Sequence, residues 1–396
     1  MRRRRATLLV VALWAMVVAG GLASRPAWPI DETRYLAVAW EMWAGGDLLV
    51  PHLNGTPYSD KPPLLFWLVV AGWRLFGVSE WWARLVPSLF ALGSLLLTAR
   101  LARRLWPERE NVAHAAPLFL LATFFWSFFS TVFLFDMLLV FLALVAVAGA
   151  VAAARGDGRG WIGVSLAIAL GILAKGPAIL IPVLPVVLAA PLWSGEVRAA
   201  RWYPRAIAAI LAGLALALAW ALPAALSGGR AYGEAILWSQ TAGRLSRAFA
   251  HPRPIWWYAP FLPLLAFPWV LWPSLWRRAD VRAPARDKGL RLCAIWAGAG
   301  LVAFSLVSGK QVYYLLPLIP PLALLGARLL PARETAPRRR ELALIAAAFL
   351  LLAAVLAGAR WFAAPFGLPT WLASLPPAAG VVVALGAAAR DRKSVV

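Results

Sequence analysis

The feature that most constrains this chain is a series of apolar segments, each long enough to cross a bilayer. A transmembrane helix needs about 20 mostly apolar residues, and such windows recur throughout the 396 residues. The composition, 62% hydrophobic and 14% charged, leaves too little polar surface for a soluble fold. The sequence therefore predicts an all-α polytopic membrane protein. We expect about twelve transmembrane helices, near 6–24, 80–99, 113–129, 133–154, 160–174, 177–193, 206–226, 256–275, 292–308, 312–330, 341–360 and 371–389.

Clusters of arginine between these segments set the expected orientation. The positive-inside rule places basic turns in the cytoplasm, and the clusters lie at 2–5, 100–109, 277–291 and 338–340. We expect the N-terminus in the cytoplasm of a bacterial-type inner membrane, with the first span retained rather than cleaved as a signal peptide. These turns also account for the net charge of +22, so we expect no nucleic-acid partner.

The expected organisation is a single transmembrane domain over 1–396. It consists of a first span, a large extracytoplasmic loop, core spans and C-terminal spans without a soluble C-terminal domain, at 1–24, 25–79, 80–330 and 331–396. Within the loop we expect interfacial helices. One is the segment 62–77, which is too short and too broken by Pro, Trp and Arg to span.

The loop carries an unusual share of the polar residues. Five of the 17 acidic residues fall between Asp31 and Lys61. Ionisable groups near a membrane are costly and usually mark a site. We expect this loop to contain the chemistry.

Each candidate in the loop also has a structural explanation. Asp31 and Glu32 precede an amphipathic stretch and could cap its helix, or could serve as a general base or as metal ligands. Asp60 and Lys61 precede Pro-Pro and could simply end a loop, or the ammonium could hold a phosphate. Asp136, alone in the apolar stretch FLFDMLLVF, costs about 2.5–3.5 kcal/mol at mid-helix unless it is paired or useful.

Several familiar motifs are absent from the sequence. There is no GxGxxG, no GxxxxGK[ST] and no GxSxG, which argues against a nucleotide-driven pump or a serine hydrolase. Cys293 is the only cysteine, and His251 has no HxxxH or HExxH partner. From spacing alone, the sequence predicts no intrinsic metal site.

An ordered set of motifs resembles the polyprenyl-phosphate-sugar-dependent glycosyltransferases of the GT-C class, the aminoarabinose transferase and protein O-mannosyltransferase group. The set comprises DETRY, GDLLVPHLNGTPYSDKPPLLFWL, FGVSEWWARLVPSL, the Asp136 span, AKGP, QTAGRL, HPRPIWWYAPFLPLLAFPW and SGKQVYYLLPLIPPLALL, between residue 31 and about residue 325.

The resemblance implies roles for individual residues. Asp31 would be the catalytic acid of the first loop and Asp136 a second acid facing the same cavity, with Glu32 as a further catalytic candidate. The residues implied to bind the lipid phosphate are Arg34, Tyr35, Lys61, Arg244 and Lys310. Asp60 and His251 occupy positions where some relatives hold zinc. At position 131 this chain has Thr, where many relatives have a basic residue.

The resemblance implies a sugar donor linked to polyprenyl phosphate, and an envelope lipid, glycan or protein as acceptor. No cofactor is required, and a divalent metal such as zinc, magnesium or manganese is optional. Two alternatives are a transporter, which would favour internal repeats and midplane charges, and a non-catalytic accessory subunit. We see no convincing repeat.

Overall fold

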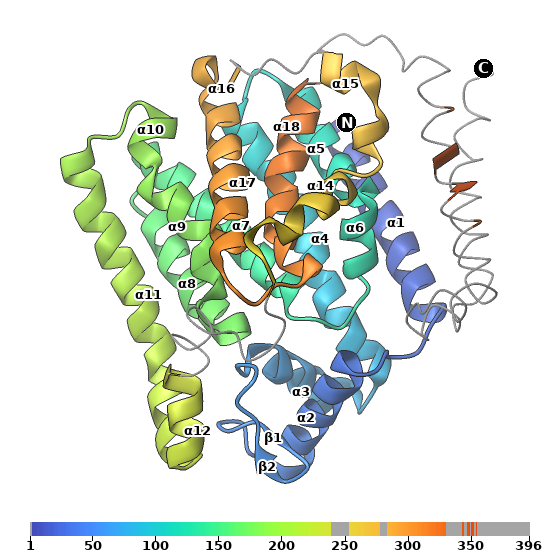
Figure 1. Cartoon of the computed structure of the whole chain (residues 1–396), viewed down its shortest axis with the longest axis vertical. Coiled ribbons are helices and arrows are strands. Elements are labelled where there is room, and N and C mark those ends of the chain that lie inside the picture. The colour runs from blue at the N-terminus through green and yellow to red at the C-terminus, as the bar shows by residue number, and fades with distance from the viewer. Residues whose placement is uncertain are drawn as a thin grey trace.

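The computed structural model describes residues 2–238, 253–277 and 283–329, with scattered helical residues between 343 and 354. Its described part is a bundle of helices with one two-stranded hairpin (Figure 1). The elements follow in this order: α1 (Arg2–Ala23), α2 (Asp31–Gly45), β1 (His52–Leu53), β2 (Thr56–Pro57), α3 (Leu64–Phe76), α4 (Glu80–Leu105), α5 (Glu110–Ala122), α6 (Phe124–Phe129), α7 (Asp136–Ala154), α8 (Gly160–Lys175), η1 (Gly176–Ile179), α9 (Leu180–Leu188), α10 (Ala190–Ser194), α11 (Ala199–Ser227), α12 (Arg230–Glu234), η3 (Ile255–Phe261), α14 (Leu262–Leu265), η4 (Trp269–Leu271), α15 (Pro273–Arg277), α16 (Ala283–Arg286), α17 (Lys288–Leu306), η5 (Val312–Leu318) and α18 (Ile319–Leu329).

Seven helical segments in the described part are long and apolar enough to cross a membrane, and together they make the chain a multi-pass membrane protein. They are Arg3–Ala23, Glu80–Leu105, Asp136–Ala154, Gly160–Leu188, Ala199–Ser227, Lys288–Leu306 and Val312–Leu329. The count of twelve stays a prediction, because 341–360 and 371–389 lie largely outside the described residues.

The expected spans 113–129 and 256–275 are among those that are not continuous helices. The segment 113–129 breaks at Thr123, whose extended backbone separates α5 from α6. The segment 256–275 is a series of short helical turns, and each of its four prolines removes a backbone donor that a continuous helix would use (Pro260, Pro263, Pro268 and Pro273).

The stretch Gly160–Leu188 reverses direction at Gly176, so it forms two antiparallel legs, as the sequence predicts for 160–174 and 177–193. Trp202 packs on Trp161 at the start of the first leg, with ring centroids 4.5 Å apart. The same indole donates a hydrogen bond of 2.8 Å to the carbonyl of Val187 at the end of the second leg. The reversal itself requires Gly176, whose φ of 65° lies in the left-handed region.

Helices α7 and α8 pack closely at the end of the bundle remote from α2. A Cβ at Gly149 would lie 2.6 Å from the carbonyl oxygen of Gly160, so only glycine permits this approach. The two helices run side by side from there to Asp136 and Lys175, at the opposite end. This packing fixes where both charged side chains lie.

The two ends of the bundle differ in the way the sequence predicts. The basic turns meet at one end, where Arg155 donates to the carbonyl of Arg104, Lys288 pairs with Glu196 at 2.5 Å, and Trp106 and Arg328 both bind Asp287. The loop with α2, the hairpin and α3 lies at the other end (Figure 1). The expected helix at 62–77 is present as α3.

Candidate functional site

Helix α2 places the first candidate carboxylates at the loop end of the bundle. It begins at Asp31, and both Asp31 and Glu32 lie in its first turn, where the helix dipole favours negative charge. The residue that caps the helix, Ile30, makes no side-chain hydrogen bond. Asp31 therefore does not act as a side-chain cap, and its carboxylate contacts other groups.

A partly exposed charged cluster consists of Asp31, Arg34 and Asp60. The guanidinium of Arg34 lies 3.2 Å from Oδ1 of Asp31 and 3.9 Å from Oδ2 of Asp60. All three side chains are between 31% and 44% exposed, which leaves room for a ligand. Burial opposes the charge of Arg34, but Tyr58, Asp31 and Asp60 outweigh it and raise the guanidinium pKa. The cluster thus keeps a permanent cation between two carboxylates.

Tyr35 joins this cluster to the core. Its hydroxyl donates to Oδ1 of Asp31 at 3.5 Å, and its ring packs edge-on against Phe135 with centroids 5.1 Å apart. Burial, followed by the charge of Asp31, raises the pKa of Tyr35, so the phenol remains a donor. Lys61 lies over the ring of Tyr35, with Nζ 5.6 Å from the ring centroid. The structure therefore brings Asp31, Arg34, Tyr35, Asp60 and Lys61 together, and their predicted roles stay predictions.

Asp136 begins α7 and is almost fully buried. Its carboxylate pairs with Nζ of Lys175 at 2.5 Å. Phe135, whose ring packs on that of Tyr35, directly precedes Asp136, so the start of α7 lies beside α2. Because a buried charge is costly without a partner, Lys175 explains how a carboxylate is tolerated in this apolar helix.

Lys175 had no role in the sequence-based prediction, although AKGP was one of the motifs. It ends α8, and its ammonium lies 4.5 Å and 5.1 Å from the ring centroids of Tyr314 and Tyr313. The signal that could have identified it is charge balance. One carboxylate and one ammonium, each alone in an apolar helix on the same side of the bundle, are expected to pair.

Lys310 is buried and holds two backbone segments together. Its Nζ donates to the carbonyls of Val307, at 2.5 Å, and Arg253, at 3.0 Å. Burial lowers the pKa of this ammonium. The contacts are structural, and the expected role in binding the lipid phosphate stays a prediction.

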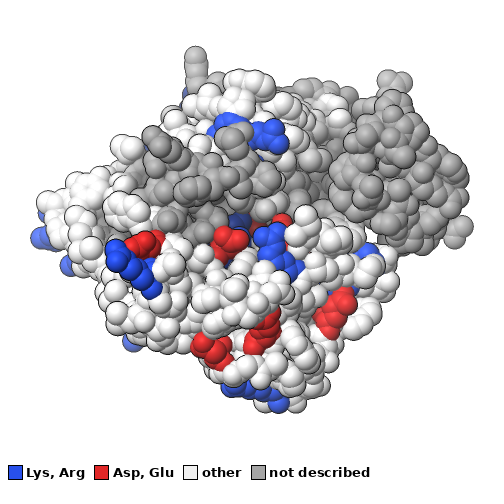
Figure 2. All heavy atoms as spheres, turned by 60° about the horizontal axis from the view of Figure 1, so that its bottom comes forward, with Lys and Arg blue, Asp and Glu red and all other residues white. Residues whose placement is uncertain are grey.

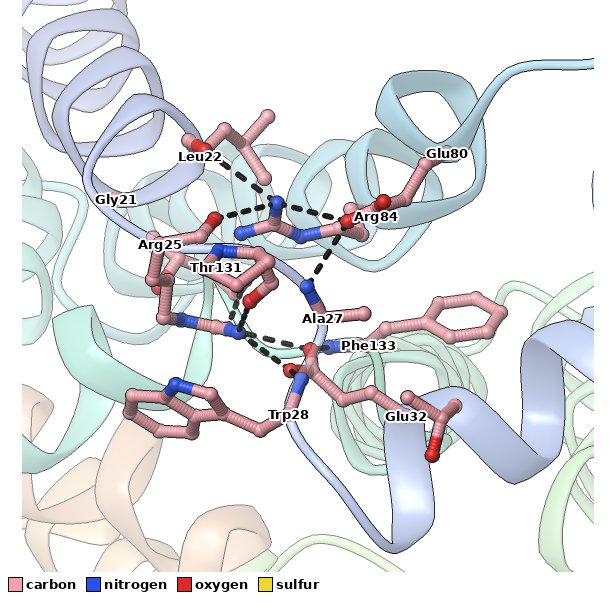
Figure 3. A network of polar contacts seen from close by, with 12 residues as sticks. Gly21, Leu22, Arg25, Ala27, Trp28, Glu32, Glu80, Arg84, Thr131 and Phe133 are labelled. Carbon is pink, nitrogen blue, oxygen red and sulfur yellow. Dashed lines mark hydrogen bonds and ion pairs between the residues drawn. The ribbon is translucent and has the colours of Figure 1, made fainter. Parts of the chain in front are cut away.

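Glu32 points away from Asp31 into a separate network, shown in Figure 3. It is 2% exposed and pairs with Arg25. Its oxygens also accept hydrogen bonds from the backbone N–H groups of Trp28, at 2.7 Å, and Phe133, at 2.5 Å. Arg25 in turn donates to the carbonyl of Thr131, so a basic side chain from elsewhere contacts position 131.

The remaining predicted residues give no complete metal site. Arg244 and His251 lie outside the described residues. Asp60, the other proposed zinc ligand, faces Arg34, and no group of three or more His, Cys, Asp or Glu side chains comes together in the described part of the chain. The optional metal therefore stays a prediction, and no catalytic step below depends on it.

Charged side chains of both signs gather at the end of the molecule that carries α2 and α3 (Figure 2). The described members of the proposed site come from the first loop, the start of α7 and the end of α8. The site therefore combines segments that are far apart in sequence at one end of an apolar bundle.

Comparisons with known proteins agree with this geometry. The profile of the dolichyl-phosphate-mannose-protein mannosyltransferase family matches residues 60–225. An undecaprenyl phosphate-α-4-amino-4-deoxy-L-arabinose arabinosyl transferase of Pseudomonas aeruginosa is 33% identical over 356 residues, covering 84% of this chain and 61% of its own length. The corresponding enzyme of Pseudomonas paraeruginosa is 32% identical over 383 residues, covering 90% of this chain and 66% of its own. The chain thus spans about two thirds or less of the length of these relatives.

Solved structures give the same result. The crystal structure of ArnT from Cupriavidus metallidurans bound to undecaprenyl phosphate superposes with a TM-score of 0.76 at 26% identity, over 96% of this chain and 71% of that one. The archaeal oligosaccharyltransferase AglB from Archaeoglobus fulgidus shares the fold, with a TM-score of 0.53 at 13% identity, over 96% and 56% of the two chains. In sequence and in fold, the chain is similar to the aminoarabinose transferases, and it has the architecture of the GT-C glycosyltransferases.

Proposed function

We propose that this chain is a membrane glycosyltransferase that moves a sugar from a polyprenyl-phosphate carrier to an envelope acceptor. The observation that carries the proposal is the half-exposed Asp31 paired with Arg34, with Lys61 over the ring of Tyr35, at the end of the bundle that also holds the buried Asp136–Lys175 pair. This arrangement offers one accessible base and two cations, which is what transfer from a lipid phosphate needs. The names of the relatives and of the ligand-bound ArnT structure support the class of donor.

The proposed reaction is a single inverting displacement. The Asp31 carboxylate takes the proton of the acceptor hydroxyl, and the acceptor oxygen attacks the anomeric carbon. The bond between that carbon and the phosphate oxygen breaks, and its electron pair leaves with the carrier. The carrier phosphate, a diester with one negative charge, becomes a monoester with two.

Arg34 and Lys61 would meet this additional charge. Both are cations at the rim of the cluster on α2, and preformed cations stabilise charge that develops in a transition state. Arg244, which lies outside the described residues, and Lys310 are proposed to assist.

Among the three candidate acids, only Asp31 is suited to the role of base. Asp136 is 3% exposed at its side chain and is held by Lys175, while Glu32 is buried with Arg25 and two backbone donors. Asp31 is 43% exposed, so an acceptor can reach it. We assign Asp136 the task of holding Lys175 and the adjacent wall of the site.

The proposed location is the outer face of a bacterial-type inner membrane. Arg2–Arg5 begin α1 at the end of the bundle opposite the site (Figure 1). With these arginines in the cytoplasm, the loop that carries Asp31 faces outward. A lipid, a glycan and a protein all remain candidate acceptors.

The test is transfer by the purified chain in nanodiscs. A panel of polyprenyl-phosphate sugars would be offered with crude envelope acceptors, with Asp31→Asn as the control. Transfer that requires Asp31 supports the proposal and identifies the donor. No transfer with any donor by a folded preparation supplied with divalent metal would instead favour the accessory or transport function.

A further inference from the structure

The structure assigns Glu32 as a positioning residue that sets the distance between the two candidate acids, Asp31 and Asp136. This inference rests on the proposed function. It replaces the expected catalytic role of Glu32 with an indirect one.

The Glu32 carboxylate has no capacity left for substrate. A carboxylate offers about four lone-pair sites, and four donors occupy them. Oε2 accepts from Arg25 Nη1 and from the Trp28 N–H, and Oε1 accepts from Arg25 Nη2, at 3.2 Å, and from the Phe133 N–H. A group so saturated and only 2% exposed cannot take an acceptor proton.

These bonds join the two acid-bearing segments directly. Glu32 follows Asp31 in the first turn of α2, and Phe133 precedes Asp136 by three residues in the connection between α6 and α7. The Phe133 amide donates to Glu32 at 2.5 Å across 101 residues of sequence. One carboxylate thus fixes the start of α2 against the start of α7.

Arg25 supports the same junction from the connection between α1 and α2. Besides pairing with Glu32, it donates to the Thr131 carbonyl at 3.0 Å. Its own carbonyl accepts from the buried Arg84 on α4 at 2.8 Å, as Figure 3 shows. Two arginines, Arg25 and Arg84, therefore stabilise this junction between the start of α2 and the segment before α7.

Helix α2 also contains a matched control. Glu41, nine residues further on, likewise accepts two backbone hydrogen bonds, from Asn54 at 2.5 Å and Gly55 at 3.0 Å. These donors belong to the turn of the hairpin and not to the segment before α7. Glu41→Gln thus makes the same chemical change on the same helix without touching the junction.

The first experiment measures hydrogen exchange of the full chain in nanodiscs and needs no substrate. We expect Glu32→Gln to speed exchange in peptides covering residues 131–136 at least about tenfold, since the Phe133 amide loses a charged acceptor. Glu41→Gln should speed exchange at residues 54–55 only. Unchanged exchange at 131–136 in Glu32→Gln would overturn the inference.

The second experiment measures transfer at saturating and limiting donor. Misplacement by about 1 Å can cost about 10²-fold in rate, so Glu32→Gln should lower kcat by about 10- to 100-fold. Donor KM should stay within about threefold, because the cations that grip the donor are untouched. The unfolding midpoint should fall, because Arg25 stays buried without its carboxylate. Glu41→Gln should transfer at nearly the wild-type rate.

Arg25→Lys separates positioning from direct catalysis. It keeps the positive charge but loses the fork that holds both oxygens of Glu32. A positioning role predicts the same fall in kcat and the same faster exchange at 131–136. A catalytic Glu32 predicts transfer at or above the wild-type rate, since its carboxylate would be released, and that result would overturn the inference.

These experiments distinguish failure of the proposed glycosyltransferase function from failure of the positioning role of Glu32. If wild type transfers no sugar, the proposed function fails while the exchange experiment still tests the junction. If wild type transfers and Glu32→Gln transfers equally well despite faster exchange, the positioning role fails and the proposed function stands. Should Glu32→Gln not accumulate, Arg25→Lys carries both measurements.

Discussion

Two adjacent carboxylates, Asp31 and Glu32, have opposite surroundings. Asp31 is 43% exposed beside Arg34 and Tyr35, whereas Glu32 is 2% exposed with four donors around it. One residue along an α-helix rotates the side-chain direction by about 100°, so Asp31 faces the open end of the molecule and Glu32 faces Arg25 and the segment before α7. Adjacent acids in a motif therefore need not share a function, and exposure together with unused hydrogen-bond capacity tells them apart.

The largest effect on transfer is expected from neutralising Asp31, the exposed member of the two adjacent acids. We expect Asp31→Asn to lower sugar transfer by about 10³-fold, because a general base contributes about 10²–10⁴. The unfolding midpoint in detergent should be unchanged, since the side chain is half exposed. Transfer near the wild-type rate would remove Asp31 from the mechanism.

Asp136→Asn should have the next largest effect, and on stability as well as on transfer. Leaving the Lys175 ammonium buried without its carboxylate costs about 3–5 kcal/mol, which thermal unfolding would report. The double variant Asp136→Asn/Lys175→Met should recover most of the lost stability.

Recovery of stability without recovery of transfer would show that the pair also serves the reaction. A single variant as stable as wild type would contradict the buried ion pair.

Lys61→Met tests whether the exposed cluster that contains Asp31 also binds the donor phosphate. Loss of a charged contact to the donor phosphate costs about 1.5–3 kcal/mol, so binding of undecaprenyl phosphate should weaken about 10- to 100-fold. Lys61→Arg, which keeps the charge over the Tyr35 ring, is the matched control. Binding by microscale thermophoresis in detergent would check this, and equal affinities for wild type and Lys61→Met would contradict it.

Tyr35→Phe should have the smallest effect. It removes the hydroxyl that donates to Asp31 but keeps the ring against Phe135 and Lys61. A hydrogen bond to a charged group contributes about 1.5–3 kcal/mol at normal length, and this one is long at 3.5 Å. Transfer should therefore fall only about five- to tenfold at constant donor KM. A loss as large as that of Asp31→Asn would mean that the phenol itself takes part in the chemistry.

Much of the architecture could be predicted from the sequence, because hydropathy and basic turns act over whole segments. Apolar windows gave the helices now seen at α1, α4, α7, α11 and α17, and the basic turns do meet at one end of the bundle. The breaks at Thr123 and through 256–275 were missed, since apolar content does not reveal where prolines and extended residues end a helix.

The sequence indicates which residues of the first loop lie together in the candidate site, but not which distant residues pair with one another. Asp31, Arg34, Tyr35, Asp60 and Lys61 lie within thirty-one residues, so one loop brings them together. The pairing of Asp136 with Lys175, and of Glu32 with Phe133, depends on how distant segments pack. Sequence spacing carries no information about such contacts.

The central claim is that Asp31 acts in the chemical step and not in binding the donor. A single-turnover measurement with Asp31→Asn tests it most directly, using a saturating labelled donor in nanodiscs beside the donor Kd. The account predicts a Kd within about threefold of wild type and a transfer rate about 10³-fold lower. An unchanged rate, or a lost rate fully explained by lost binding, would contradict it.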